Sequence, residues 1–231
     1  MPNIPLAERL RPKTIDEYIG QEHLVGRNGV FRKFFETGNV PSFILWGPPG
    51  VGKTTLAKIV ATQLDRPFFT LSAVTSGVKE VREVIESARK QRFFDQRPPF
   101  LFIDEIHRFN KSQQDSLLGA VEQGIVTLIG ATTENPSFEV ISPLLSRCQV
   151  YILRPMEDKD LQTLLDRALT ADIELREREI EVQQTGALFR FAGGDARKLL
   201  NILDIIVGAT DGKVTITDQY VTDCLQQNIA L

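Results

Sequence analysis

The residues from Gly47 to Thr54 have the types and spacing of a phosphate-binding loop: Gly, four residues, Gly, Lys and Thr. Glycines let successive backbone N–H groups turn toward the β- and γ-phosphates of a nucleotide without a Cβ clash. Lys53 adds a positive charge and Thr54 offers a hydroxyl to Mg²⁺. An accidental glycine turn is the alternative, but an apolar run precedes the loop and a helical pattern follows it, as this mechanism requires. The predicted contacts to ATP are Gly47, Pro48, Pro49, Gly50, Val51, Gly52, Lys53, Thr54 and Thr55.

Two carboxylates, Asp104 and Glu105, directly follow the apolar residues 100–103. A parallel strand delivers residues at its carboxyl end to the mouth of the sheet, which places these two beside the phosphates. We predict that Asp104 binds Mg²⁺, directly or through water, and that Glu105 orients and deprotonates an attacking water. The alternative is a strand that ends in a solvated acidic turn, and the phosphate loop earlier in the chain makes that alternative the weaker one.

Hydroxyls and arginines further along the chain are additional candidates. Thr132 and Thr133 follow an apolar run, where a hydroxyl can touch the γ-phosphate or the attacking water, although hydroxyls are also common in turns. Arg147 precedes the last apolar run, and Arg197 opens a helical pattern after a glycine pair. A planar guanidinium suits the charge on a transferring phosphoryl group. Spacing alone favours the plainer interpretation of both arginines, a surface salt bridge.

The elements that position these residues alternate along the first two-thirds of the chain. Short apolar runs of strand length are typical of strands buried on both faces of a parallel sheet. Longer amphipathic stretches lie between them, so the pattern predicts a doubly wound α/β sheet of five parallel strands flanked by helices. The predicted strands are 42–46, 67–71, 99–103, 126–131 and 149–153, and the predicted helices between them are 54–64, 78–91 and 111–123.

The pattern changes at Pro155, after which helical spacing dominates. The predicted helices are 158–171, 177–191, 195–207 and 217–227. We therefore expect an α/β nucleotide-binding domain at 1–155 and a small all-helical domain at 156–231.

Composition narrows the class of protein. The chain has 231 residues, a formal net charge of −3 and 42% hydrophobic residues, which is ordinary for a globular protein and gives no overall basic field. Nucleic acid would need a local basic patch or oligomerisation. Cys148 and Cys224 lack metal-ligand spacing, no apolar run approaches the roughly 18 residues of a membrane span, and the N-terminus does not resemble a signal peptide. We expect a cytoplasmic, nucleoid-associated protein with reduced thiols and no membrane partner.

These motifs, in this order, resemble those of the AAA+ ATPases of the clamp-loader branch, over nearly the whole chain. The resemblance implies a Walker A motif at 47–54, a Walker B motif at 100–105, and a helical lid after the sheet domain. Glu105, Thr132 and Arg147 are its implied catalytic residues, with Thr133 as the alternative to Thr132 for sensor 1, Arg147 as the arginine finger and Arg197 as sensor 2. It further implies that the adenine pocket includes Arg11, Pro12, Tyr18 and Ile19, and that ATP and Mg²⁺ bind, with Thr54 and Asp104 on the metal.

Three longer strings, 72–80, 107–115 and 130–138, give a narrower resemblance to the replication-associated recombination protein A family. That family is also called MgsA and includes the Werner-helicase-interacting ATPases. The resemblance implies a DNA-dependent ATPase at stalled forks and single-strand gaps, with replication proteins as further partners. Ser72 stands where many relatives have a polar switch residue, and its role stays open.

Assembly is also implied by this resemblance. It indicates a homo-oligomer, a tetramer built by a C-terminal domain that we expect this sequence to lack. Arg147 would act on the ATP of a neighbouring subunit, so a chain ending here should bind ATP and hydrolyse it slowly.

A candidate surface for DNA begins at 74–77 and continues along the next helix. Its cations are Lys79, Arg82, Arg89, Lys90 and Arg92, and Glu80, Glu83 and Glu86 share the same helix. Contacts of this type bind phosphates without reading sequence. Charge alone leaves DNA binding and a solvated helix face evenly matched, and the family resemblance favours DNA, with weak binding by a single subunit. Asn110, Lys111 and Gln114 offer a second contact or a link to the Walker B strand.

Two other functions compete with this hypothesis. A Holliday-junction branch-migration motor also carries a Gly-Ala-Thr-Thr segment, but the strings at 72–80 and 134–138 argue against it. A nucleotide-gated scaffold with little turnover is the second, and the intact Glu105 argues against that one.

Overall fold

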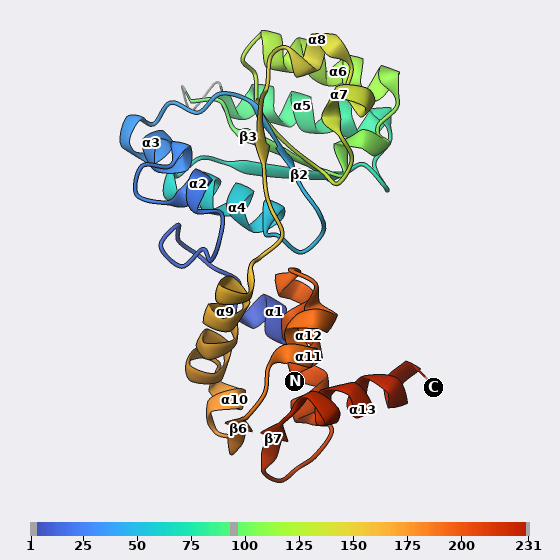
Figure 1. Cartoon of the computed structure of the whole chain (residues 1–231). Coiled ribbons are helices and arrows are strands. Elements are labelled where there is room, and N and C mark those ends of the chain that lie inside the picture. The colour runs from blue at the N-terminus through green and yellow to red at the C-terminus, as the bar shows by residue number, and fades with distance from the viewer. Residues whose placement is uncertain (1–3, 93–96, 230–231) are drawn as a thin grey trace. The chain divides into compact units, whose positions relative to one another are not determined.

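The computed structural model describes residues 4–92 and 97–229. These residues form two compact units (Figure 1). One unit, the α/β unit, contains Lys13–Arg154. The other, the helical unit, combines the described residues up to Pro12 with those from Pro155 onward.

The α/β unit is built on a parallel five-stranded sheet, as the sequence predicts. The strands are β1 Phe43–Trp46, β2 Phe68–Ser72, β3 Phe100–Asp104, β4 Thr127–Thr132 and β5 Gln149–Ile152. Their order in space is β2-β3-β4-β1-β5, and every neighbouring pair is parallel. This order makes β1, β3 and β4 the three central strands.

Helices cover both faces of this sheet (Figure 1). One side carries α2 Glu22–Val25, α3 Val30–Thr37 and α4 Lys53–Gln63. The other carries α5 Val78–Arg92, η1 Ile106–Arg108, α6 Lys111–Glu122, α7 Pro136–Glu139 and α8 Ser142–Leu145. The helices predicted between the strands are confirmed to within about a residue at each end; α2, α3, η1, α7 and α8 were not predicted.

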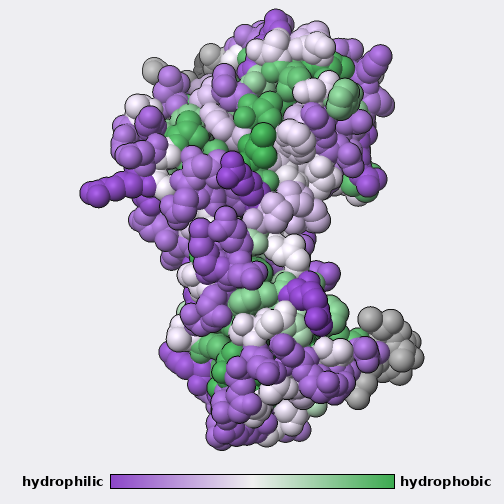
Figure 2. Space-filling view, viewed as in Figure 1, coloured by the Kyte–Doolittle hydropathy of each residue, from purple (hydrophilic) through white to green (hydrophobic). Residues whose placement is uncertain are grey.

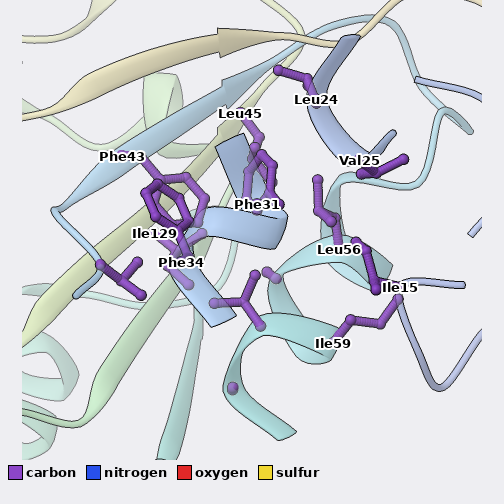
Figure 3. Packing of buried hydrophobic residues seen from close by; sticks show 14 of the residues in the cluster. Ile15, Leu24, Val25, Phe31, Phe34, Phe43, Leu45, Leu56, Ile59 and Ile129 are labelled. Atoms are coloured by element: carbon purple, nitrogen blue, oxygen red, sulfur yellow. The ribbon is translucent and has the colours of Figure 1, made fainter. Parts of the chain in front are cut away.

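Alternate residues of the central strands enter two hydrophobic clusters, one on each face of the sheet. Phe43 of β1 packs against Phe31 of α3 with ring centroids 5.5 Å apart (Figure 3). Its neighbour Ile44 packs on the opposite face with α5 and α6. This two-residue period explains why the strands read as continuous apolar runs.

The expectation of burial on both faces is wrong for β5. Val150 and Ile152 are 39% and 52% exposed. β5 is the last strand in the order and pairs only with β1, so the helical layers cover it less.

The helical unit contains α1 Leu6–Arg9, α9 Asp158–Ala171, α10 Ile173–Arg176, α11 Gly186–Ala192, α12 Ala196–Gly208 and α13 Asp218–Ile229. It is not all-helical, because β6 Ile180–Val182 and β7 Val214–Ile216 form a parallel two-stranded ladder. The helix predicted at 177–191 is therefore wrong in its first half, where Ile180 and Val182 alternate with a glutamate in a strand pattern. Turn residues separate β6 from α11, which begins at Gly186.

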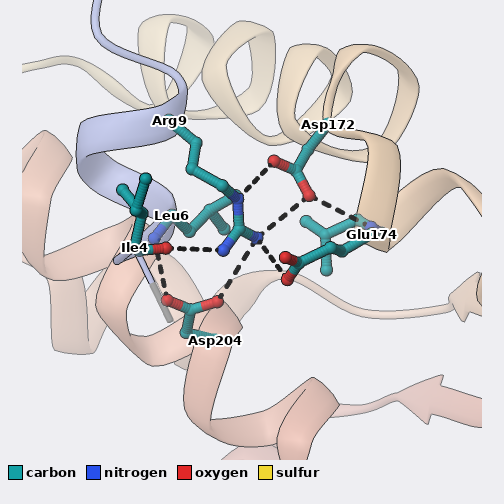
Figure 4. A network of polar contacts seen from close by, with 7 residues as sticks. Ile4, Leu6, Arg9, Asp172, Glu174 and Asp204 are labelled. Carbon is teal, nitrogen blue, oxygen red and sulfur yellow. Dashed lines mark hydrogen bonds and ion pairs between the residues drawn. The ribbon is translucent and has the colours of Figure 1, made fainter. Parts of the chain in front are cut away.

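The N-terminal segment belongs to the helical unit, whereas the sequence analysis placed it in the sheet domain. Leu6 is fully buried there, and its backbone N–H donates to Asp204 of α12 at 2.9 Å. Arg9 donates from Nε and Nη2 to the two oxygens of Asp172, at 2.7 and 3.0 Å (Figure 4). This ion pair joins residues that are 163 positions apart in the sequence. Because packing and the ion pair both connect distant parts of the chain, the local sequence pattern did not reveal that the N-terminal segment belongs to the helical unit.

Polar side chains cover most of the face drawn in Figure 2, and hydrophobic residues reach it in smaller areas. Among the described residues, none of the helices has the length and apolar character needed to cross a membrane.

Candidate functional site

Three of the sequence-predicted motifs meet at one edge of the sheet. Trp46, which precedes the loop, pairs with Thr132, and Ile103, which precedes the acidic pair, pairs with Gly130. Because the strands are parallel, the loop after β1, the carboxylates after β3 and the threonines after β4 all leave the sheet at its carboxyl edge. The structure thus brings three separate sequence motifs to adjacent strand ends.

The loop from Gly47 to Gly52 has a conformation that only glycine takes without strain at several positions. Gly50 and Gly52 have φ values of +71° and +92°. A Cβ at Gly47 would lie 2.4 Å from the carbonyl oxygen of Leu153. Lys53 Nζ donates to the carbonyls of Gly47 and Pro48 at 2.7 and 2.8 Å, so its charge lies within the turn of the loop.

The helix α4 begins at this loop without a side-chain cap. Its N-cap is Gly52, which has no side chain to cap the first N–H groups of the helix. Uncapped N–H groups and the positive end of an 11-residue helix are a suitable environment for phosphate oxygens. Thr54 and Thr55 lie half-buried in the first turn.

Tyr18 supports the loop from its buried side. Its side chain is 7% exposed, and its hydroxyl donates to the carbonyl of Val51 at 2.8 Å. A Cβ at Gly52 would lie 2.5 Å from that hydroxyl, so a glycine is required here for space as well as for φ. Burial raises the pKa of Tyr18 well above its ordinary value, which keeps the hydroxyl a donor. The family resemblance implies a place for Tyr18 at an adenine pocket and does not predict this support. Ile19, next in the chain, is half-buried in the same unit.

Glu105 is held in a specific conformation after β3. Its backbone is left-handed, with φ +53° and ψ +48°, which is uncommon for a residue with a Cβ. Its Oε2 accepts from Thr133 Oγ1 at 3.3 Å and lies 3.2 Å from His107 Nδ1. His107 was not among the predicted site residues, and only its position two residues after Glu105 could have indicated it.

The two candidate threonines differ in their contacts. Thr132 ends β4 and is fully buried, and its hydroxyl contacts both backbone groups of Glu134 and His107 Nδ1. Thr133 is half-buried and its hydroxyl reaches the carboxylate of Glu105. Of the two hydroxyls, that of Thr133 is therefore the one in contact with Glu105.

The residues proposed for Mg²⁺ are oxygen donors on two adjacent elements. Thr54 lies in the first turn of α4, and Asp104 is the last residue of β3, half-buried and paired in register with Ser72. Among the described residues no cluster of three or more His, Cys, Asp or Glu side chains could hold a metal. One hydroxyl and one carboxylate, completed by phosphate oxygens, fit the coordination that Mg²⁺ takes in nucleotide sites.

Arg147 lies away from this loop. It precedes β5, and therefore comes at the amino end of a strand whose carboxyl end adjoins Gly47. Its guanidinium is paired with Glu122 of α6 and donates to the carbonyl of Pro143 at 2.6 Å. The structure does not bring Arg147 together with Glu105.

Three further predicted residues belong to the helical unit. Arg11 pairs with Glu8, and Pro12 follows it. Arg197 is exposed in the first turn of α12, whose N-cap Asp195 accepts from the Lys198 N–H at 2.9 Å.

The surface predicted for DNA contains cations paired with acids. Lys79 lies 3.8 Å from Glu83 and Arg89 lies 3.7 Å from Glu86. Glu80 accepts from the N–H of Gly77 at 2.8 Å, so this carboxylate occupies the start of α5. The side chain of Arg92 lies outside the described residues.

Of the two roles predicted for Gln114, the direct contact with DNA is wrong, while a link to the segment after the Walker B strand agrees with its contacts. Its side chain is 2% exposed, and its amide bonds to the backbone of Phe109, Glu139 and Ile141. A buried amide with these partners connects the segment after β3 to the segment before α8 and is inaccessible to DNA.

Comparisons with known proteins agree with this architecture. Residues 43–156 match the family described as "ATPase family associated with various cellular activities (AAA)". The chain is 46% identical over 217 residues to the ATPase WRNIP1 of Dictyostelium discoideum, covering 93% of this chain and 25% of that protein. It is 44% identical over 210 residues to replication-associated recombination protein A of Haemophilus influenzae, covering 90% of this chain and 47% of that protein.

Solved structures give a consistent result. The Thermotoga maritima RuvB Holliday junction branch migration motor is similar with a TM-score of 0.72 at 28% identity, over 94% of this chain and 72% of that one. The chain spans about half the length of its bacterial relative and a quarter of the Dictyostelium one. An AAA ATPase fold implies that the α/β unit binds nucleotide. The chain therefore belongs to the AAA family of ATPases, and over most of its length it is a relative of replication-associated recombination protein A and of WRNIP1.

Proposed function

We propose that this protein hydrolyses ATP and acts on DNA during replication-associated recombination. The observation that carries the proposal is the meeting of the phosphate loop, the Asp104–Glu105 pair and Thr133 at adjacent carboxyl ends of the sheet. The relatives named for replication-associated recombination support the biological role. By analogy with its bacterial relatives, we place this protein in the cytoplasm at the nucleoid.

The phosphate loop is proposed to bind the triphosphate of ATP. Backbone N–H groups from Gly50 to Thr55 surround the phosphates, and Lys53 turns its ammonium from the loop carbonyls toward them. Thr54 and Asp104 would hold Mg²⁺, which when bound stabilises the negative charge of the phosphates. Tyr18 keeps the loop in shape through Val51.

Glu105 is proposed as the general base. It takes a proton from a water whose oxygen bonds to the γ-phosphorus, while the bond from that phosphorus to the bridging oxygen of ADP breaks. A positioned base contributes about 10²- to 10⁴-fold to rate. Thr133, which contacts Glu105, is proposed as sensor 1 in preference to Thr132.

Arg147 is proposed to act on the ATP of a neighbouring subunit in a homo-oligomer. Arg147 lies at the amino end of β5, and this location supports the role. The phosphate loop of the same subunit follows the neighbouring strand β1 and so lies at the opposite, carboxyl end of the β1–β5 pair. A tetramer is the assembly we propose for the full-length protein. The helical unit would be the lid, with Arg197, Arg11 and Pro12 contributing to the nucleotide site.

DNA is proposed to contact α5 weakly. Lys79, Arg82 and Lys90 line one shallow groove on this helix together with Glu83 and Glu86. Such a mixed surface offers few net positive charges for each subunit, so binding strength would come from several subunits acting together.

The proposal is tested by steady-state ATP turnover of the full-length protein with and without gapped DNA. We expect stimulation by gapped DNA, loss of nucleotide binding in Lys53→Ala, and retained binding with at least about a hundredfold slower turnover in Glu105→Gln. Turnover that no DNA structure changes would refute the DNA-dependent role. Unchanged turnover in Glu105→Gln would refute the assignment of the base.

The structural likeness to RuvB supports a second candidate, a branch-migration motor. The higher identity to replication-associated recombination protein A makes it the weaker one. Strand exchange of a synthetic four-way junction, driven by ATP and absent in Glu105→Gln, would favour the motor. Stimulation by gaps without such exchange favours our first proposal.

A further inference from the structure

His107 is located between Thr132, which ends β4, and the carboxylate of Glu105, which follows β3. It is the middle residue of η1, and its side chain is 14% exposed. One atom makes both of its contacts in this region: Nδ1 lies 3.0 Å from Thr132 Oγ1 and 3.2 Å from Glu105 Oε2. The ring therefore links the end of one central strand to the carboxylate delivered by the next.

The hydrogen-bonding capacity of these groups favours a hydrogen on Nδ1. An ionised carboxylate can only accept, so a bond between Glu105 and Nδ1 requires a hydrogen on Nδ1. Thr132 Oγ1 already donates to the carbonyl of Glu134 at 3.2 Å and accepts from the N–H of Glu134 at 3.0 Å. With its own hydrogen on that carbonyl, the hydroxyl has one more acceptor position, which a hydrogen on Nδ1 fills. A donor at Nδ1 therefore bonds to Thr132 and lies within ion-pair distance of Glu105.

Thr132 is a rigid partner for this donor. It is fully buried at the end of a central strand and is fixed further by its two bonds to Glu134. Glu105 starts from a left-handed backbone conformation, which directs its side chain away from the path of an ordinary turn. Within the part of the chain that the structure describes, both side-chain contacts to Glu105 reach Oε2.

We propose that His107 is a positioning residue for ATP hydrolysis, which holds Glu105 through Nδ1–H while Thr132 holds His107. Thr133 anchors the same oxygen from the other side, so Oε1 is presented to the attacking water. This inference rests on the proposed role of Glu105 as general base. It also gives the buried Thr132 a function in the site that needs no direct contact with phosphate.

The geometry permits a test that separates positioning from packing. The amide nitrogen of asparagine can take the place of histidine Nδ1, whereas that of glutamine reaches about as far as Nε2. In the full-length protein, His107→Asn should therefore keep kcat within about threefold of the natural protein. His107→Gln and His107→Ala should lose at least about tenfold in kcat, as expected for a lost hydrogen bond to a charged group. KM for ATP should stay within about twofold in all three variants, since no contact of His107 reaches the phosphate loop in this geometry.

Several outcomes would overturn the inference. If His107→Gln retains kcat and His107→Asn loses it, the side chain acts by volume or through Nε2. If all three variants match the natural protein, His107 does not position Glu105. A loss confined to KM would place His107 in nucleotide binding instead. Fluorescent-nucleotide binding and thermal melts of each variant establish that it is folded, and a variant that does not fold is replaced by Thr132→Val, which should lower kcat through the same contact.

The Glu105→Gln variant separates this inference from the proposed function. If Glu105→Gln stops turnover and His107→Ala does not change it, the inference fails and the function stands. If Glu105→Gln leaves turnover unchanged, the proposed base is wrong and both fail.

Discussion

Replacing Arg9 with alanine should destabilise the helical unit without unfolding the α/β unit. In the natural sequence the guanidinium donates to both oxygens of Asp172, at 2.7 and 3.0 Å, and to the carbonyl of Ile4 at 2.7 Å (Figure 4). It also lies 3.1 Å from Glu174 and 4.0 Å from Asp204. The substitution removes all of these contacts at once and leaves the N-terminal segment held by the buried Leu6 and its bond to Asp204.

Burial decides which contacts matter for the magnitude. The Asp172 side chain is 4% exposed, so losing its cation leaves a nearly buried carboxylate with fewer donors. The Glu174 and Asp204 side chains are 63% and 37% exposed, and such pairs contribute at most about 1 kcal/mol between them. A hydrogen bond to a charged group contributes about 1.5–3 kcal/mol. Both hydrogen bonds from Arg9 go to the carboxylate of Asp172, which keeps its hydrogen bond from the Leu175 N–H after the substitution. We expect a total loss of about 2–3 kcal/mol, or roughly 10–20 °C in the melting temperature of a unit this size.

The loss should depend on pH in a defined direction. The hydrogen bonds from Arg9 hold the pKa of Asp172 below its ordinary value. The folded state therefore binds fewer protons than the unfolded state near that pKa, so the stabilisation is complete above the unfolded pKa of about 3.9. This stabilisation disappears as the pH falls further, through the lowered pKa that Asp172 has in the folded state. The difference between Arg9→Ala and the natural protein should accordingly shrink below about pH 4.

Two optical probes can follow the units separately. The single tryptophan, Trp46, lies in β1 and reports the α/β unit, while far-UV circular dichroism reports helices in both. In urea, Arg9→Ala should shift the circular dichroism transition and leave the Trp46 transition within about 0.5 kcal/mol. Arg176→Ala, an exposed change in the same unit, is the matched control and should have little effect. Equal shifts at both probes, or a loss below about 1 kcal/mol, would refute the reasoning.

Three other predictions concern the α/β unit. Tyr18→Phe removes the hydroxyl beneath the phosphate loop and should cost about 1 kcal/mol in a Trp46-detected urea transition, with weaker ATP binding; no change in either would contradict the supporting role. Mixed oligomers of Arg147→Ala and Glu105→Gln subunits should regain part of the turnover that each variant lacks alone, because one interface then combines an intact arginine with an intact base; no recovery would place Arg147 on its own subunit's ATP. Burial raises the pKa of Cys148 to about 12, so in a Cys224→Ser background alkylation at pH 8 should be far slower than in urea, and equal rates would show an accessible thiol.

The sequence predicted the sheet and the phosphate loop because both are encoded locally. The first four residues of β3 are all apolar, and the loop needs glycines at fixed spacing before a lysine. The carboxyl-edge meeting of Asp104 and Thr133 also followed from sequence, since parallel strands place their ends together. In each case the physical requirement falls on neighbouring residues in the chain.

Contacts between distant residues account for what the sequence did not reveal. Tyr18 supports Val51 from 33 positions away, and His107 meets Thr132 from 25 positions away. The β6 strand pairs with β7, and its three residues are too few for their alternation to stand out within the longer stretch predicted as a helix. No spacing rule within one segment contains such information, so these residues emerge only once the fold has placed them.

The placement of the N-terminal segment has a mechanical consequence. Arg9 fastens the segment to the helical unit, while Tyr18, nine residues later, is fixed under the phosphate loop of the α/β unit. The chain therefore passes between the units twice, near Pro12 and again near Pro155. Two covalent connections restrict the motions available to a pair of units more than one connection does. If the helical unit acts as a lid, Arg9→Ala should loosen one of the two constraints, and weakened ATP binding with an unchanged Trp46 transition would be its signature.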